Sequence, residues 1–169
     1  MTGVQTCALP ISRFVPGHPI AGTENNGVAA SFAELYQNRR VILTPLAEND
    51  AASVVRVREM WQACGAEGTE MPVQHHDEVL AATSHLPHML AFGLVDMLAR
   101  LKENDEVFRY AAGGFRDFTR IASSNPVMWR DICIANRQAL GPMLAAFADE
   151  MNELAARIGA ADGDALLAI

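Results

Sequence analysis

The stretch that decides the fold is HHDEVLAATSHLPHMLAFGLVDMLARLK, residues 75–102. A helix through it carries apolar side chains on nearly every side, and a helix with so little polar surface is buried in a core or at a subunit interface. Pro87 lies well inside the stretch and is expected to kink the helix, because proline donates no backbone hydrogen bond. The apolar residues are Val79, Leu80, Leu86, Met89, Leu90, Phe92, Leu94, Val95, Leu98 and Leu101.

The sequence stays helical to its end. Residues 111–126, AAGGFRDFTRIASSNP, contain a glycine-pair break at Gly113–Gly114 and a short amphipathic segment. Asn125 and Pro126 form a favourable N-cap and first-residue pair for the next helix. That helix is expected to run from Val127 to about Ile158, with a bend at Gly141–Pro142. Residues 74–169 therefore predict an all-helical domain.

Upstream, residues 13–73 show a mixed pattern. Two short strands, RFVPG (13–17) and RRVILTPL (39–46), precede a predicted helix over 50–64, and EGTEMPV (67–73) follows as another strand. Asn49 or Asp50 would cap this helix and Gly65 would end it. Its apolar stripe consists of Val54, Val57, Met60 and Trp61. Strand, helix and strand in this order indicate the last βαβ unit of an α/β sheet.

The first twelve residues, MTGVQTCALPIS, fit neither a targeting signal nor a periodic element. They resemble translated sequencing-adapter sequence, and we interpret residues 1–12 as extraneous or disordered. The alternative is an ordinary frayed terminus.

Composition excludes several classes of partner. Half of the 169 residues are apolar, and the formal net charge of −7 disfavours nucleic acid, which binds clustered Lys and Arg. No apolar run approaches the ~20 residues of a membrane span. The three cysteines, Cys7, Cys64 and Cys133, are widely spaced and show no CxxC pattern, which favours a reducing, cytoplasmic location. No GxGxxG or P-loop motif is present.

Three groups of residues could carry chemistry, and the first is His18 in GHPIAGTE (17–24). A histidine at a strand end, fixed by a neighbouring proline, is well placed for proton transfer near neutral pH. Thr23 and Glu24 could orient a ligand or the imidazole. A plain loop histidine is the alternative.

The second group is His76, Asp77, His85 and His88. His85 and His88 are three residues apart and share a helix face. Neutral imidazoles bind metals, but the spacing matches no recognised ligand set. Polar groups that line a substrate pocket, or core histidines with internal partners, are the other interpretations.

The third group is Arg116 and Arg120, four residues apart among apolar neighbours. A partly desolvated guanidinium needs a carboxylate or phosphate partner. Asp117 and Asp131 could supply it within the chain, and a ligand carboxylate is the functional alternative.

Together, GHPIAGTE, HDEVLAATSHLPH and GGFRDFTRIASSNPVMWRDI resemble the prephenate dehydrogenase (cyclohexadienyl or arogenate dehydrogenase) family from about Arg13 to the C-terminus. The resemblance implies a mainly α chain, with residues 13–73 as a small α/β remnant of a Rossmann-type NAD-binding domain. Residues 74–169 would be the all-helical dimerisation and substrate domain. Most of the NAD-binding domain would be missing, and the chain alone would be inactive.

The resemblance also implies roles for individual residues. His18 matches the catalytic histidine that takes the proton of the ring hydroxyl, and Arg120 matches the arginine that grips a substrate carboxylate. His88, His85 and His76 match pocket histidines, and Thr23 and Glu24 match positions near the site. Trp129 matches a tryptophan that forms pocket wall or packing.

The expected function is the NAD-dependent oxidative decarboxylation of prephenate to 4-hydroxyphenylpyruvate, in a cytoplasmic homodimer. NADP could replace NAD, and arogenate could replace prephenate. No metal, nucleic acid or membrane is expected to take part. A non-catalytic helical dimerisation module and, third, a metal enzyme that uses His76, His85 and His88 remain as alternatives.

Overall fold

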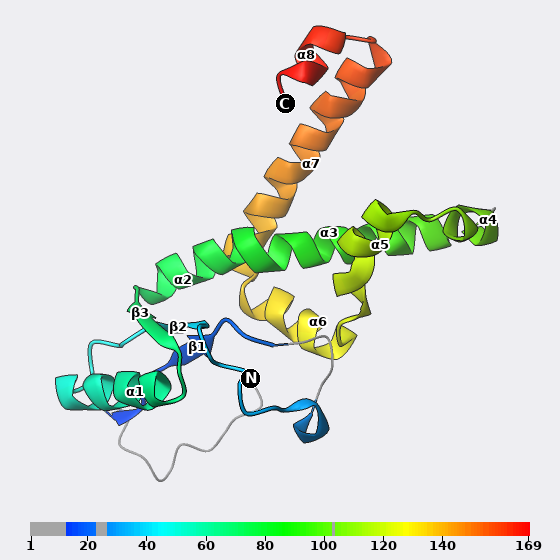
Figure 1. Cartoon of the computed structure of the whole chain (residues 1–169). Coiled ribbons are helices and arrows are strands. Elements are labelled where there is room, and N and C mark those ends of the chain that lie inside the picture. The colour runs from blue at the N-terminus through cyan, green and yellow to red at the C-terminus, as the bar shows by residue number, and fades with distance from the viewer. Residues whose placement is uncertain (1–12, 23–26, 103) are drawn as a thin grey trace.

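A small sheet with one covering helix joins an extended array of helices in the computed structural model, which describes residues 13–22, 27–102 and 104–169 (Figure 1). The strands are β1 (Gly17–Pro19), β2 (Arg40–Leu43) and β3 (Glu67–Glu70). The α-helices are α1 (Ala51–Ala63), α2 (Val73–Leu80), α3 (Leu86–Ala99), α4 (Asn104–Arg109), α5 (Gly113–Thr119), α6 (Pro126–Ala135), α7 (Arg137–Gly159) and α8 (Gly163–Leu167). Short 3₁₀ segments η2 (Val28–Ala30) and η4 (Arg120–Ser123) and a π-helical segment η3 (Ala81–His85) complete the described elements. The predicted mainly α chain with a small α/β part is confirmed.

The sheet contains the predicted βαβ unit. Its strand order is β1-β2-β3, and β2 and β3 run parallel with Ile42 opposite Thr69. The helix between them, α1, packs Val57 and Trp61 on the buried Val41 and Leu43. Met60 is 51% exposed, so that part of the predicted apolar stripe is wrong.

The ends of α1 follow the sequence signals. The Asp50 carboxylate accepts a hydrogen bond from the Ser53 backbone N–H at 2.8 Å, which satisfies one of the helix's unpaired donors. Gly65 follows the C-cap with φ of +82°, a conformation that glycine adopts without strain. A Cβ on Gly65 would also lie 3.1 Å from Gln37 Cγ, a tight contact that adds to the strain of the positive φ for any larger residue.

The first strand lies later in the chain than residues 13–17, where it was predicted. It covers Gly17–Pro19 and runs antiparallel to β2, with His18 opposite Ile42. Pro16 has no N–H to donate, and its carbonyl accepts from Thr44 N at the point where pairing begins. His18 therefore lies in the middle of β1 rather than beyond its end.

Helices α2 and α3 run on in nearly one direction, with η3 between them (Figure 1). The Leu86 N–H bonds the Ala81 carbonyl, five residues back, in the widened turn that defines a π-helix. Pro87 comes directly afterwards and cannot donate to the carbonyl four residues before it. The disturbance expected from Pro87 is present, but as a π-helical segment rather than a sharp kink.

The chain breaks between α6 and α7 at Asn136, whereas the sequence predicted one long helix bent at Gly141–Pro142. Asn136 has φ of −100° and ψ of 25°, outside the helical region, and its side chain bonds residues of α2 and η3. Pro142 lies inside α7 without interrupting it. The N-cap pair is confirmed, since Asn125 Oδ1 accepts from the N–H groups of Val127 and Met128.

The glycine pair occupies a different place from the one predicted. Gly113 and Gly114 open α5, and the non-helical residues between α4 and α5 are Tyr110, Ala111 and Ala112.

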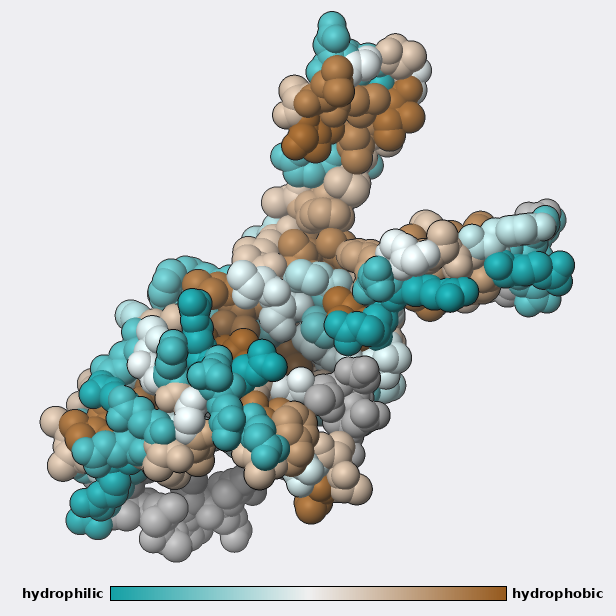
Figure 2. All heavy atoms as spheres, in the orientation of Figure 1, coloured by the Kyte–Doolittle hydropathy of each residue, from teal (hydrophilic) through white to brown (hydrophobic). Residues whose placement is uncertain are grey.

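Apolar side chains are widely exposed on the helical part of the single chain. In α3 only Ala91 is buried, and Met97 is 51% exposed, so the all-round apolar helix is not enclosed in a core. Figure 2 shows a hydrophobic surface at the tip formed by α8 and the end of α7, where Ile158, Leu167 and Ile169 are exposed. None of the described helices is long and apolar enough to cross a membrane.

Candidate active site

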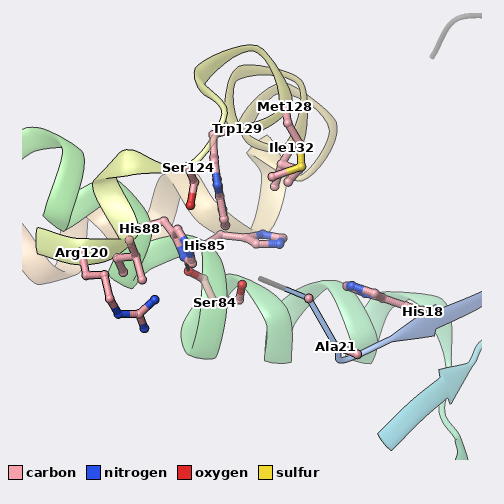
Figure 3. Close-up of a pocket in the computed structure, with 12 residues that line it drawn as sticks. His18, Ala21, Ser84, His85, His88, Arg120, Ser124, Met128, Trp129 and Ile132 are labelled. Carbon is pink, nitrogen blue, oxygen red and sulfur yellow. Dashed lines mark hydrogen bonds between the residues drawn. The ribbon is translucent and has the colours of Figure 1, made fainter. Parts of the chain in front are cut away.

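A cavity of about 400 Å³ lies where the β1 segment meets the helical part of the chain (Figure 3). We call it the His18 cavity. Residues from five separate segments line it: His18 of β1 with Ala21 and Gly22 just after this strand, Ser84 and His85 of η3, His88 of α3, Arg120 and Ile121 of η4 with Ser124 at its end, and Met128, Trp129 and Ile132 of α6. The cavity therefore brings together at least one residue from each of the three groups that the sequence singled out.

His18 reaches the cavity from β1, where strand pairing fixes its backbone. Its Nδ1 lies 2.9 Å from Nε2 of His76, and the two rings are tilted by 59°. Although the residue is exposed on the cavity wall, surrounding protein atoms partly desolvate the ring. This desolvation lowers the pKa of His18 below its usual 6.5, and the nearby His76 lowers it further. His18 is therefore neutral at pH 7 and has a ring nitrogen able to accept a proton.

His85 is the most enclosed histidine of the cavity, with 8% of its surface exposed. Its Nδ1 lies 3.0 Å from the Asn136 amide nitrogen, which donates, so the proton of neutral His85 is on Nε2. Burial lowers the pKa of His85, and the neighbouring histidines lower it further. His85 thus offers the cavity a neutral N–H donor.

His88 lies against Trp129, with ring centroids 3.7 Å apart and planes 20° from parallel. The His88 Nδ1–H donates to the Ser84 carbonyl at 2.8 Å. Desolvation lowers the pKa of His88, the bond to Ser84 raises it, and Arg120 lowers it. The stacked pair forms one wall of the cavity.

Trp129 is buried on the first turn of α6, where its backbone N–H bonds the Asn125 carbonyl. Its Nε1 has no hydrogen-bond partner among the described residues. The residue therefore forms apolar wall, and its buried indole N–H is unsatisfied among the described residues.

Arg120 begins η4 on the side of the cavity opposite His18 (Figure 3). It is exposed, so the partial desolvation expected from its apolar neighbours is wrong. Arg116 does not line the cavity. Asp131, one suggested internal partner for these arginines, instead pairs with Arg130 at 2.7 Å.

One of the site residues proposed from the sequence, His76, is described by the structure but is not on the cavity wall. His76 lies behind His18 and bonds it from outside the cavity. Thr23 and Glu24 fall outside the described residues. Within the described part of the chain, no three His, Cys, Asp or Glu side chains gather in a way that could hold a metal ion.

The sequence reasoning missed two hydroxyl groups and one amide. Ser84 and Ser124 line the cavity, and Asn136 holds His85 from behind. Ser84 precedes His85 directly, so the SHLPH stretch was a signal that could have identified it. Asn136 gave no such signal, because its contacts join segments more than fifty residues apart.

Two family models match the chain, one after the other. Residues 4–70 match "Prephenate dehydrogenase, nucleotide-binding domain", and residues 72–169 match "Prephenate dehydrogenase, dimerization domain".

Individual relatives agree with these matches. A cyclohexadienyl dehydrogenase of Zymomonas mobilis is 45% identical over 161 residues, which cover 94% of this chain and 55% of that protein. A prephenate dehydrogenase of Bacillus subtilis is 43% identical over 130 residues, 76% of this chain and 35% of that protein. The chain spans about half the length of the curated relatives it matches, or less.

Solved structures show the same fold. The structure of prephenate dehydrogenase from A. aeolicus in complex with hydroxyphenyl propionate and NAD⁺ superposes with a TM-score of 0.85 at 41% identity, covering 92% of this chain and 55% of that one. An arogenate dehydrogenase of Synechocystis superposes with a TM-score of 0.78 at 28% identity, over 92% of this chain and 57% of that one. With both family models matched in order along its length, the chain belongs to the prephenate dehydrogenase family.

Proposed function

We propose that the chain forms the substrate half of a dehydrogenase that oxidises and decarboxylates prephenate, or its amino analogue arogenate, with NAD or NADP as hydride acceptor. One observation carries this proposal: a neutral histidine acceptor, His18, and a guanidinium donor, Arg120, face the same cavity. Prephenate presents a ring hydroxyl at one end and carboxylates at the other. A site for it therefore needs a proton acceptor and a guanidinium on opposite sides of one cavity.

His18 acts on the ring hydroxyl. Its unprotonated nitrogen takes the hydroxyl proton while the hydride leaves the same carbon, as general-base catalysis requires. The ring carboxylate departs as CO₂, and its bonding electrons complete the aromatic ring. The proton returns from His18 to the phenol oxygen of the product, so the histidine ends each turnover neutral.

Arg120 and His85 hold the substrate. A guanidinium binds a carboxylate through two parallel hydrogen bonds, which a lysine cannot reproduce. His85 offers an Nε2–H donor from a buried position. The stacked His88 and Trp129 form the wall against which the substrate ring would lie. The resemblance to the family also assigns Thr23 and Glu24 to this site, and that assignment remains part of the proposal.

The described residues do not fit the pyrophosphate of a dinucleotide. Such a group binds a glycine-rich turn at a helix N-terminus. After β2, however, the N-terminus of α1 is capped by the Asp50 carboxylate, which would repel a phosphate. The cofactor, when bound, accepts the hydride, and the part of the chain that the structure describes handles the substrate.

A homodimer completes the proposal. The C-terminal match is to a dimerisation domain, and apolar side chains of α3, α7 and α8 are exposed in the single chain. A cytoplasmic location is proposed from the cysteines, since Cys64 and Cys133 are free thiols.

The test uses a chimera in which the preceding half of the Zymomonas relative is joined to this chain at Arg13. We expect NADH production with prephenate. His18→Asn should lower kcat by roughly 10²- to 10⁴-fold, the usual contribution of a general base. Arg120→Ala should raise KM by about 10- to 100-fold, the equivalent of a charge-assisted hydrogen bond of roughly 1.5–3 kcal/mol.

Arg116→Ala is the matched control, because Arg116 is exposed and away from the cavity, and it should leave both constants unchanged. A folded chimera without turnover of prephenate or arogenate would contradict the proposed function. Unchanged kcat in His18→Asn would remove the proton-transfer role.

A further inference from the structure

His18 is held from behind by a second histidine and a carboxylate. His18 Nδ1 lies 2.9 Å from His76 Nε2, and His76 Nδ1 lies 2.9 Å from Asp77 Oδ1. The three side chains form a line from β1 to the first turns of α2. Only His18 among them lines the cavity, so His76 and Asp77 reach the cavity through their contact with His18.

The bonding partners determine where each proton lies. A carboxylate oxygen accepts hydrogen bonds, so the contact of His76 Nδ1 with Asp77 Oδ1 requires the hydrogen to be on Nδ1. In the imidazole form of His76 that carries this one hydrogen, Nε2 accepts from Nδ1–H of His18. This leaves Nε2 of His18 unprotonated, as the one ring nitrogen not engaged by His76.

We propose that His76 and Asp77 are positioning residues that fix the tautomer of His18, with its proton on Nδ1 and its basic nitrogen, Nε2, available to the substrate hydroxyl. The catalytic consequence rests on the proposed function, whereas the tautomer is a property of the folded chain. When His18 accepts the hydroxyl proton on Nε2, its Nδ1–H stays bonded to His76, and the Asp77 charge stabilises the imidazolium through His76. The proton leaves again by Nε2 to the phenol oxygen.

The backbone carbonyl and the carboxylate of Asp77 contact different residues. The buried Asn136 amide donates to the Asp77 carbonyl at 2.8 Å and so holds this turn of α2 in place. The carboxylate is 46% exposed and fills no core, so its packing does not explain its contact with His76. Among the described residues, the titratable groups that interact with His18 are His76, which contacts it, and His85.

The first test reads the tautomer directly by ¹⁵N NMR on the imidazole nitrogens of this chain, with the His18 signals assigned from the His18→Asn spectrum. A neutral histidine without partners favours the proton on Nε2. We expect Nδ1–H in the unaltered chain and a shift toward Nε2–H in His76→Ala. His76→Gln should retain Nδ1–H, because the glutamine oxygen can occupy the place of His76 Nε2 and accept the same bond.

The second test measures kinetics in the chimera. His76→Ala should lower kcat by about 10- to 100-fold, because a wrongly protonated histidine cannot act as the base, with KM within about twofold. His76→Gln should recover part of kcat, which loss of packing alone would not allow. Asp77→Asn keeps the shape of the side chain and removes the charge, so it should lower kcat without unfolding the protein. His75→Ala, at the exposed neighbouring histidine, is the matched control and should change neither readout.

The outcomes separate this inference from the proposed function. A proton on Nε2 of His18 in the unaltered chain, or an unchanged tautomer in His76→Ala, would overturn the positioning role whatever the reaction is. An inactive chimera with the expected tautomer would overturn the proposed function and leave the tautomer assignment standing. If His76→Ala changes the His18 tautomer but leaves kcat unchanged, the tautomer has no effect on catalysis and that part of the inference is wrong.

Discussion

His18, His85 and His88 all have pKa values lowered mainly by burial, and this gives the chain a pH-dependent stability. Below the ordinary pKa of 6.5 the unfolded chain takes up protons that the folded chain resists. The free energy of unfolding should therefore fall as the pH is lowered from 7.5 through 6.5 to 5.5, and recover as the pH is raised. Urea unfolding at these three pH values measures this dependence.

Single substitutions assign the effect to the cavity. His85→Gln removes one of the three contributions and should flatten the pH dependence. His75→Gln, at an exposed position, should leave the slope as it was. A free energy of unfolding that is constant between pH 7.5 and 5.5 would show that the three rings are protonated as easily in the folded chain as in the unfolded one.

At the scale of elements, the junction of α6 and α7 depends on Asn136. Its amide donates to the Asp77 carbonyl and to His85 Nδ1, at 2.8 and 3.0 Å. Asn136→Ala leaves the buried His85 Nδ1 without a partner, at a cost of about 1–3 kcal/mol, whereas the Asp77 carbonyl keeps its bond from the Ala81 backbone N–H. We expect a loss of about 1–3 kcal/mol in the free energy of unfolding, measured by urea denaturation.

Asn152→Ala is the matched control, since it makes the same change on an exposed face of α7. Alanine is the better helix former by less than about 1 kcal/mol, so this variant should be neutral or slightly stabilised. Equal effects of the two substitutions would mean that the Asn136 contacts contribute nothing to stability.

The same junction shows which elements sequence could predict. Helix α1 and the start of α6 were predicted correctly because Asp50, Gly65, Asn125 and Pro126 act within one or two turns of their own positions. The break at Asn136 depends on contacts to residues 51 and 59 positions earlier, which no local pattern records. For the same reason the prediction of one continuous helix from Val127 to about Ile158 was wrong, while Pro142 lies inside α7.

At the scale of the whole molecule, the candidate site was predictable as a set of residues but not as an arrangement. The motifs identified His18, His85, His88, Arg120 and Trp129, and all five line one cavity. That His76 lies behind His18, rather than beside the substrate, follows from how α2 meets β1. The π-helical segment was also unforeseen, although it carries Ser84 and His85 into the cavity.

The exposed apolar surface of the helical part leads to the prediction about assembly. Leu144, Met151 and Ile158 recur every seven residues along α7, so they form one stripe, and each is at least 39% exposed. A single chain gains nothing from such a stripe, whereas two chains that bury it gain the hydrophobic stabilisation that it offers. We expect the chain to be a dimer in light scattering and sedimentation, and Met151→Glu with Ile158→Glu to dissociate it.

The control places the same two charges elsewhere on α7. Asn152→Glu with Ala156→Glu adds them to an exposed face turned roughly 100° or more from the stripe, and this variant should remain dimeric. If the chain is monomeric at micromolar concentration, or if both double variants stay dimeric, the stripe is not the contact. Dissociation by both would show only that added charge opposes association. Selective loss with the Met151 and Ile158 pair would therefore identify α7 as part of the dimer interface and would explain why so many apolar side chains of these helices are exposed in the single chain.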